Sequence, residues 1–238
     1  MDVANNTVFI TGANRGLGLA FAREAVRRGA SKVYAGMRNT SGFSEPGIIP
    51  VQIDVTEKAS IATAAEIAAD TNILVNNAGI AALIDGPLAE DFETQSQRLF
   101  DTNYYGVVRV SQAFEQALSN KSHAAIINVL SDIVWLPRPI LTPYAASKAA
   151  AWSFTNQLRH HLRDRGIQVL GLHVGFVDTD LTNGIDVPKA NPADVVRRTY
   201  DALTIGKSEI MADEGTTLLK STLAAVDPGY ITPPQGMF

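Results

Sequence analysis

Short apolar runs alternate along the chain with longer amphipathic segments, and this alternation limits the possible folds more than any other feature. The runs expected to be strands are 7–11, 32–37, 49–54, 72–76, 124–130, 167–174 and 208–212. The segments expected to be helices are 16–28, 57–70, two within 92–118, 143–165 and 191–203. The runs are apolar throughout, which is typical of strands that are covered on both faces. The pattern therefore predicts an α/β fold with a doubly wound, parallel, seven-stranded sheet flanked by helices.

The chain of 238 residues contains no internal repeat and no linker long enough to separate two domains. We therefore expect one Rossmann-like catalytic domain over residues 1–226 and a tail containing proline and glycine over residues 227–238. Thr56, Thr142 and Asn191 are expected to cap three of the helices, the last with Pro192 following. Ligands of such sheets bind beyond the carboxyl ends of the strands, so we expect the site at that edge.

Composition limits the kinds of partner and compartment. A net charge of −4 argues against a nucleic-acid surface or a patch for anionic membranes. The absence of cysteine excludes disulfides and thiolate metal sites, and the adjacent His160 and His161 do not share a helix face as a metal pair would. No apolar run approaches the roughly 20 residues of a membrane-spanning helix, and we expect no signal peptide. A cytoplasmic protein without a metal site is the resulting expectation.

A glycine-rich segment, TGANRGLG at residues 11–18, joins the first expected strand to the first expected helix. Its glycines are Gly12, Gly16 and Gly18, and their spacing differs from the common G-x-G-x-x-G pattern of dinucleotide sites. Glycine allows the backbone to approach a diphosphate closely, and a helix N-terminus favours an anion. The segment is either a diphosphate-binding turn or an ordinary tight turn between a strand and a helix.

Two arginines distinguish between the possible dinucleotides. An acidic residue after the second strand would accept a hydrogen bond from the ribose 2′-hydroxyl of NAD, whereas arginine accommodates the 2′-phosphate of NADP. Arg38 occupies this position, about 20 residues beyond the glycine segment, and Arg15 lies within that segment. Either arginine alone could be an ordinary surface cation. Together they favour NADP(H) over NAD(H), because two guanidinium groups would bind a dianionic phosphate well.

The segment LTPYAASK at residues 141–148 is expected to begin a helix with Pro143 in its first turn. Tyr144 and Lys148 then lie one turn apart on the same face. A nearby ammonium group would lower the pKa of the phenol from its ordinary value of about 10. Such a tyrosine can exchange a proton with a substrate oxygen near neutral pH. The alternative is an ordinary surface pair, since this spacing arises often by chance.

Five features in this order resemble the short-chain dehydrogenase/reductase family. They are TGANRGLG, Asp54 after the third strand, NNAG at residues 76–79, Ser131, and the Y-x-x-x-K of Tyr144 and Lys148. The resemblance extends over residues 7–179. It implies a Rossmann-like fold and an oxidoreductase that interconverts a carbonyl and an alcohol with NADP(H).

The resemblance also implies which residues contact the cofactor. Around the diphosphate and the adenosine these are Gly12, Asn14, Arg15, Gly16, Leu17 and Gly18. Asp54 and the backbone at Val55 are expected to hold the adenine. Asn77, Ala78 and Gly79 are expected on the adenosine ribose side. Val177 and Thr179 are expected near the nicotinamide carboxamide and the phosphates.

Four side chains carry the chemistry that the resemblance implies. Tyr144 is expected to be the general acid and base, and Lys148 to bind the nicotinamide ribose and lower the pKa of the phenol. Ser131 is expected to orient the substrate oxygen, and Asn103 to support a water-linked proton relay behind the lysine. Each has a structural alternative, since Ser131 could simply end a strand, Asn103 interrupt a helix and Asp54 cap a turn.

The expected substrate region departs from the family pattern. The family often has Ser-Ser-x-x-Gly around its serine, but this chain reads Leu-Ser-Asp-Ile-Val at residues 130–134, and Val174-Gly175 replaces the Pro-Gly after the sixth strand. Only residues 180–190 separate Thr179 from the next helix, so we expect a short lid and an open pocket. Apolar candidates for the pocket, each of which could instead belong to the core, are Ile133, Trp135, Leu136, Leu141 and Phe176.

Small residues along the helix 143–165 would suit docking between subunits, so a homodimer is expected, with a tetramer possible. The expected partner is otherwise a small carbonyl or alcohol substrate. A non-catalytic sensor of NADP on the same fold is the main alternative function. A biosynthetic enzyme with one narrow substrate is another.

Overall fold

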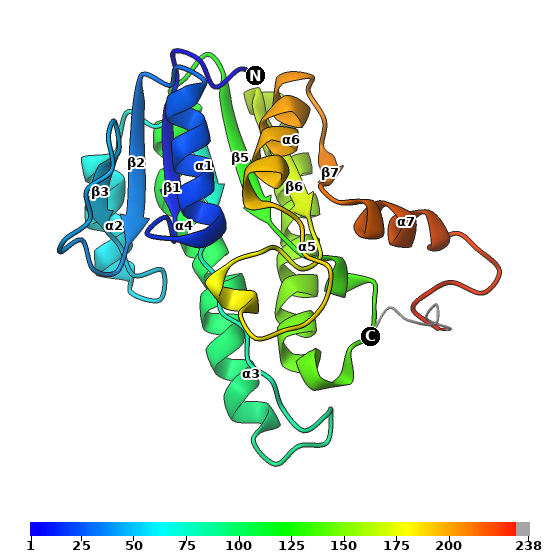
Figure 1. Ribbon diagram of the computed structural model, residues 1–238. Coiled ribbons are helices and arrows are strands. Elements are labelled where there is room, and N and C mark those ends of the chain that lie inside the picture. The colour runs from blue at the N-terminus through cyan, green and yellow to red at the C-terminus, as the bar shows by residue number, and fades with distance from the viewer. Residues whose placement is uncertain (232–238) are drawn as a thin grey trace.

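The computed structural model of the chain describes residues 1–231. A parallel sheet of seven strands lies at its centre, in the order β3-β2-β1-β4-β5-β6-β7 (Figure 1). The strands are β1 (Thr7–Thr11), β2 (Lys32–Met37), β3 (Ile49–Gln52), β4 (Ile73–Asn76), β5 (Ala124–Val129), β6 (Ile167–His173) and β7 (Glu209–Met211). The strand order reverses between β1 and β4. The predicted doubly wound parallel sheet is therefore confirmed, with strand ends shifted by one or two residues.

Helices cover both faces of the sheet. They are α1 (Gly16–Arg27), α2 (Lys58–Ile67), α3 (Phe92–Phe100), α4 (Gly106–Ser119), α5 (Thr142–Leu162), α6 (Pro192–Thr204) and α7 (Glu214–Thr222). One apolar core lies between the sheet and the pair α1 and α6, where Phe21 meets the ring of Tyr200 edge to face. The other lies under α2, α4 and α5 and includes Phe9 and Phe114. These two layers hold the carboxyl ends of the strands rigidly at one edge.

Only one of the three predicted helix caps is confirmed. The Asn191 side chain accepts a hydrogen bond from the backbone N–H of Ala193 at 2.8 Å, with Pro192 in the first helical position. Thr142 is itself helical, and its hydroxyl donates to the carbonyl of Pro139. Thr56 does not cap α2, because its N–H and its hydroxyl both donate to the carboxylate of Asp54.

Two elements were not expected from the sequence. A π-helical turn at Asp101–Tyr105 joins α3 to α4, so the two predicted helical segments of residues 92–118 form one broken helix. Helix α7 follows β7 and is capped by the Asp213 side chain. None of the helices in residues 1–231 has the length and apolarity that crossing a membrane requires. The predicted tail from Asp227 is described only as far as Ile231, and its remainder lies outside the described residues.

Candidate active site

A cleft of about 1090 Å³ lies along the carboxyl edge of the sheet. The loops after β1, β2, β4, β5 and β6 form its walls, together with the start of α5. Every residue predicted to contact the cofactor lines this cleft. They are Gly12, Asn14, Arg15, Gly16, Leu17, Gly18, Arg38, Asp54, Val55, Asn77, Ala78, Gly79, Tyr144, Lys148, Val177 and Thr179.

The backbone of the glycine segment leaves no room for side chains at Gly12 and Gly18. Gly12 has a φ of +67°, a region that favours glycine. A Cβ atom on Gly18 would lie 2.2 Å from the carbonyl oxygen of Gly12 and 2.5 Å from Nδ2 of Asn77. The Asn77 amide in turn donates to the carbonyls of Thr11 and Gly12, at 2.9 and 3.1 Å. The tight turn delivers the chain to the N-terminus of α1, where the first N–H groups lack helical partners and suit an anion.

The two arginines expected at the adenosine ribose lie differently from each other. Arg38 is exposed on the cleft wall. Burial opposes a lowered pKa of the nearby Asp54 carboxyl, but two hydrogen bonds from Thr56 and, to a smaller extent, the charge of Arg38 lower it. Arg15 instead forms an ion pair with Asp180 at 2.7 Å, both side chains being largely exposed. Both arginines line the cleft, Arg15 while paired with Asp180, and the expectation that both guanidinium groups bind the 2′-phosphate stays a prediction.

The four side chains of the expected catalytic set come from three parts of the chain. Ser131 follows β5, Asn103 lies in the π-helical turn, and Tyr144 and Lys148 lie in the first turns of α5. Ser131, Tyr144 and Lys148 line the cleft. Their positions follow from the parallel sheet, which brings the ends of β5 and the start of α5 to the same edge.

Asn103 lies behind the cleft and is fully buried. Its amide oxygen accepts from the N–H of Ile80, and its amide nitrogen donates to the carbonyl of Ile80 and to the hydroxyl of Ser147, all at 2.9–3.0 Å. A Cβ atom on Gly79 would lie 3.4 Å from Oδ1 of Asn103 and 3.6 Å from Nζ of Lys148. The asparagine thus fixes the loop after β4 against α5, next to the lysine.

The electrostatics of the tyrosine and the lysine differ from the expectation. Burial raises the pKa of Tyr144 to about 12, the negative charge of Asp132 acts in the same direction, and Ser131 and Arg138 oppose it. Burial lowers the pKa of Lys148 to about 8, and its ammonium donates to the carbonyl of Val129 at 2.9 Å. The predicted lowering of the Tyr144 pKa is therefore wrong for the protein alone, because burial and the charge of Asp132 outweigh the lowering by Ser131 and Arg138.

The sequence prediction missed one pair of charged residues in the site. Asp132 follows Ser131 directly, and its carboxylate accepts two hydrogen bonds from the guanidinium group of Arg138, at 3.3 and 3.1 Å. Both residues line the cleft. A signal for this pair was present, since an acidic residue beside the serine breaks the family's usual pattern and an arginine follows in the same loop.

The predicted apolar pocket is correct in part. Ile133, Leu141 and Phe176 line the cleft, and so do Leu181 and Ile185 of the short loop before α6. Trp135 and Leu136 pack instead against Leu219 of α7 and are not in the cleft wall. They were assigned wrongly because α7, the helix that packs against them, was not predicted from the sequence.

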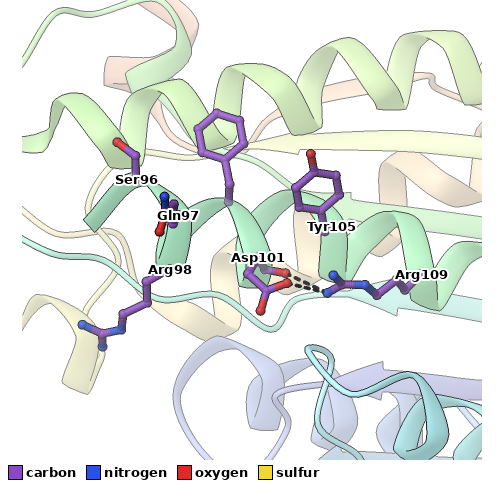
Figure 2. A pocket seen from close by; sticks show the side chains of 7 residues that line it. Ser96, Gln97, Arg98, Asp101, Tyr105 and Arg109 are labelled. Carbon is purple, nitrogen blue, oxygen red and sulfur yellow. Dashed lines mark hydrogen bonds and ion pairs between the residues drawn. The ribbon is translucent and has the colours of Figure 1, made fainter. Parts of the chain in front are cut away.

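A second hollow lies along α3, the π-helical turn and the start of α4, and shares Arg98 with the cleft (Figure 2). Its wall includes Phe100, Tyr105 and Arg109, and the guanidinium group of Arg109 pairs with Asp101 at 2.7 Å. Tyr105 is half exposed there, with its ring 5.6 Å from the Arg109 guanidinium carbon. The hollow is open and holds none of the predicted site residues.

Comparisons with known proteins identify the family. The sequence model of the short chain dehydrogenase family matches residues 6–189. The uncharacterized oxidoreductase DltE of Bacillus subtilis is 31% identical over 95% of this chain and 96% of its own. The 3-oxoacyl-[acyl-carrier-protein] reductase FabG of Escherichia coli is 31% identical over 78% of this chain and 79% of its own. A short chain dehydrogenase from Burkholderia cenocepacia, solved in complex with NADP, superposes with a TM-score of 0.89 at 32% identity, over 95% of both chains.

Proposed function

The chain belongs to the short-chain dehydrogenase/reductase family, and from this premise we propose that it is an NADP(H)-dependent oxidoreductase that interconverts a carbonyl and an alcohol. One observation carries the proposal. Ser131, Tyr144 and Lys148 meet in the same cleft as the glycine turn, so a dinucleotide bound on that turn can reach all three. The substrate is a small aldehyde or ketone in the reducing direction.

The residues that would hold the cofactor are the glycine turn, the loop after β4 and Lys148. Gly12 and Gly18 fit this role, since side chains there would clash with the loop after β4 or with the turn itself and would displace the turn that presents the N-terminus of α1 to an anion. When bound, NADPH supplies the hydride. Arg38 favours the 2′-phosphate, and the relative solved with NADP supports the same choice over NAD(H).

In carbonyl reduction, Ser131 and Tyr144 bind the carbonyl oxygen, where negative charge develops, and Tyr144 then donates its proton to that oxygen. A phenol whose pKa is raised is protonated near neutral pH, which suits this donor role. Lys148 lies on the same helix face and binds the nicotinamide ribose. Asn103 holds the neighbouring loop and supports the return of a proton to the tyrosine.

The direct test measures the oxidation of NADPH, monitored by its absorbance, in the presence of each member of a panel of aldehydes and ketones. Turnover with NADPH and weaker turnover with NADH are expected. The alternative, a non-catalytic sensor of NADP, would bind NADPH tightly and turn over nothing. A biosynthetic enzyme with one narrow substrate would also be inert toward the panel, but its activity would depend on Tyr144 once that substrate is supplied.

We also propose that the enzyme is a cytoplasmic homodimer. Small residues on the outer side of α5, including the exposed Ala146 and Ser153, would let the same helix of a second copy approach closely. Sedimentation of the purified protein tests the dimer, and only monomer at micromolar concentration would contradict it. Cell fractionation tests the location.

A further inference from the structure

A carboxylate lies beside the serine of the proposed active site. The hydroxyl of Ser131 donates to Oδ1 of Asp132 at 3.1 Å, while the N–H of Ile133 donates to the same hydroxyl oxygen at 3.3 Å. Ser131 and Asp132 are only 7% and 6% exposed. A buried carboxylate is costly unless it is paired and hydrogen-bonded, so its presence here calls for a specific role.

The loop after β5 holds this carboxylate in place. The guanidinium group of Arg138 binds both carboxylate oxygens, and its side chain is itself only 14% exposed. The guanidinium carbon stacks 4.9 Å from the centre of the Phe176 ring. On the backbone, the N–H of Asp132 donates to the carbonyl of Val174, and the N–H of Leu141 donates to that of Arg138. The carboxylate of Asp132 and the guanidinium group of Arg138 therefore form a neutral pair that these contacts hold in the cleft wall.

A serine hydroxyl has a single proton to donate. When that proton is directed to Asp132 and the N–H of Ile133 occupies one lone pair, the Ser131 oxygen has one lone pair left to accept a further hydrogen bond. Tyr144 can then donate to Ser131, which favours its protonated form. Without Asp132, the hydroxyl could instead donate to a phenolate, which favours the deprotonated form.

We propose that Asp132, paired with Arg138, is a positioning residue that directs the Ser131 hydroxyl and thereby sets the protonation state of the Tyr144 phenol. The proposal rests on the proposed function, because it concerns the pH range in which the tyrosine is a proton donor to a carbonyl. The two neighbouring charges have opposite effects on the protonation of the Tyr144 phenol. Asp132 holds the proton on the phenol, and Arg138 limits that effect.

The other charged or titratable groups in this region lie on α5, on β6, on β7 and just before α7. Lys148 lies on α5 itself, 5.8 Å from the Tyr144 ring centre, and donates to the backbone of β5. On β6, the imidazole of His173 lies 3.3 Å from the carbonyl of Ser131 and faces Glu209 of β7 on its other side. Asp213 accepts from the N–H of Gly175. Asp132 is the charged group that contacts the serine hydroxyl directly, and Arg138 contacts Asp132.

The test is a titration of Tyr144 by NMR of protein labelled with ¹³C at the tyrosine ring carbon that bears the hydroxyl. The chain has six tyrosines, and the spectrum of Tyr144→Phe identifies the signal. With saturating NADP⁺, Asp132→Asn is expected to move the titration down by about one pH unit, and Arg138→Gln to move it up by a similar amount. Combining the two changes restores a neutral pair and should return the titration close to that of the wild type. Arg138→Lys keeps the charge and should also stay close to it.

A matched control is the exposed pair of Asp194 and Arg197 on α6, at 2.9 Å, whose neutralising variants should leave the titration in place. An unchanged titration in Asp132→Asn, or shifts of the same sign in both single variants, would overturn the proposal. So would a double variant that stays shifted. If Asp132→Asn does not fold, the comparison of Arg138→Gln with the double variant still decides. The same titrations without cofactor require no catalysis, so an inactive enzyme would count against the proposed function and not against this inference.

Discussion

The ammonium nitrogen of Lys148 lies 5.8 Å from the centre of the Tyr144 ring, one turn along the same helix. Burial acts on the two groups in opposite directions, raising the pKa of the phenol to about 12 and lowering that of the amine to about 8. Both shifts favour the neutral form. The shift of the amine is a cost in stability at neutral pH, because its charged form is still buried there.

That cost can be measured by replacing Lys148 with methionine. Because the folded pKa lies below the ordinary value of 10.5, burying the charged amine destabilises the fold fully below about pH 8, and the penalty fades as the pH rises toward 10.5. The variant loses the hydrogen bond to Val129, so a net gain of about 2 kcal/mol is expected at pH 7 and little or none at pH 10. Urea denaturation at both pH values measures it.

The exposed Lys58 of α2 offers a matched control, since its change to methionine should alter stability little at either pH. Lys148→Met should also lose most of its turnover, because the variant can no longer bind the ribose. A variant less stable than the wild type at pH 7 would show that the buried charge is compensated by contacts other than Val129.

Removal of the phenol separates the proposed enzyme from a sensor. Tyr144→Phe keeps the ring and loses the proton donor, so kcat is expected to fall roughly a thousandfold. The affinity for NADPH, measured by fluorescence titration, should change by less than about twofold, because the hydroxyl makes only a small part of the cofactor contact. Tyr230→Phe, at an exposed position near the C-terminal end of the described residues, is the control. Turnover close to that of the wild type in Tyr144→Phe would refute the catalytic assignment.

The sheet could be predicted from the sequence because its strands are short, continuously apolar runs separated by clear helices. The location of the cleft could also be predicted, since the loops after parallel strands lie at one edge of the sheet. Helix α7 was missed because its apolar positions are few, and Trp135 and Leu136 were misassigned as a consequence. The pKa of Tyr144 was predicted in the wrong direction because the sequence shows the spacing to Lys148 but not the depth of burial. The Arg15 pair with Asp180 joins loops that lie 165 residues apart, and no local pattern marks it.

Coenzyme preference is expected to depend on Arg38. Its change to aspartate removes the partner of the 2′-phosphate and supplies an acceptor for the 2′-hydroxyl of NADH. The ratio of kcat/KM for NADPH to that for NADH should fall by about a hundredfold or more, as a charge-assisted phosphate contact is replaced by repulsion. Steady-state kinetics with both coenzymes measures the ratio.

A control for this change is Arg197→Asp on α6, which reverses a charge outside the cleft and should leave the ratio unaltered. Asp180→Asn adds a second check, because it releases Arg15 from its ion pair and should strengthen NADPH binding modestly at low salt. An unchanged ratio of the two kcat/KM values in Arg38→Asp would show that another residue recognises the 2′-phosphate.

The glycine turn makes the sharpest prediction about the fold of the site. A Cβ atom on Gly18 would lie 2.2 Å from the backbone oxygen of Gly12, an approach that only a shift of the turn can relieve. Gly18→Ala is therefore expected to cost about 1–3 kcal/mol of stability and most of the NADPH affinity, since the same turn would hold the diphosphate. Thermal denaturation and fluorescence titration measure the two losses.

Gly215→Ala in the first turn of α7 is the matched control for Gly18→Ala. A Cβ atom on Gly215 would lie 3.4 Å from the nearest atom, the Asp213 carboxylate, and the helical backbone there favours alanine. If Gly18→Ala bound NADPH as tightly as the control, the turn would not be the diphosphate site.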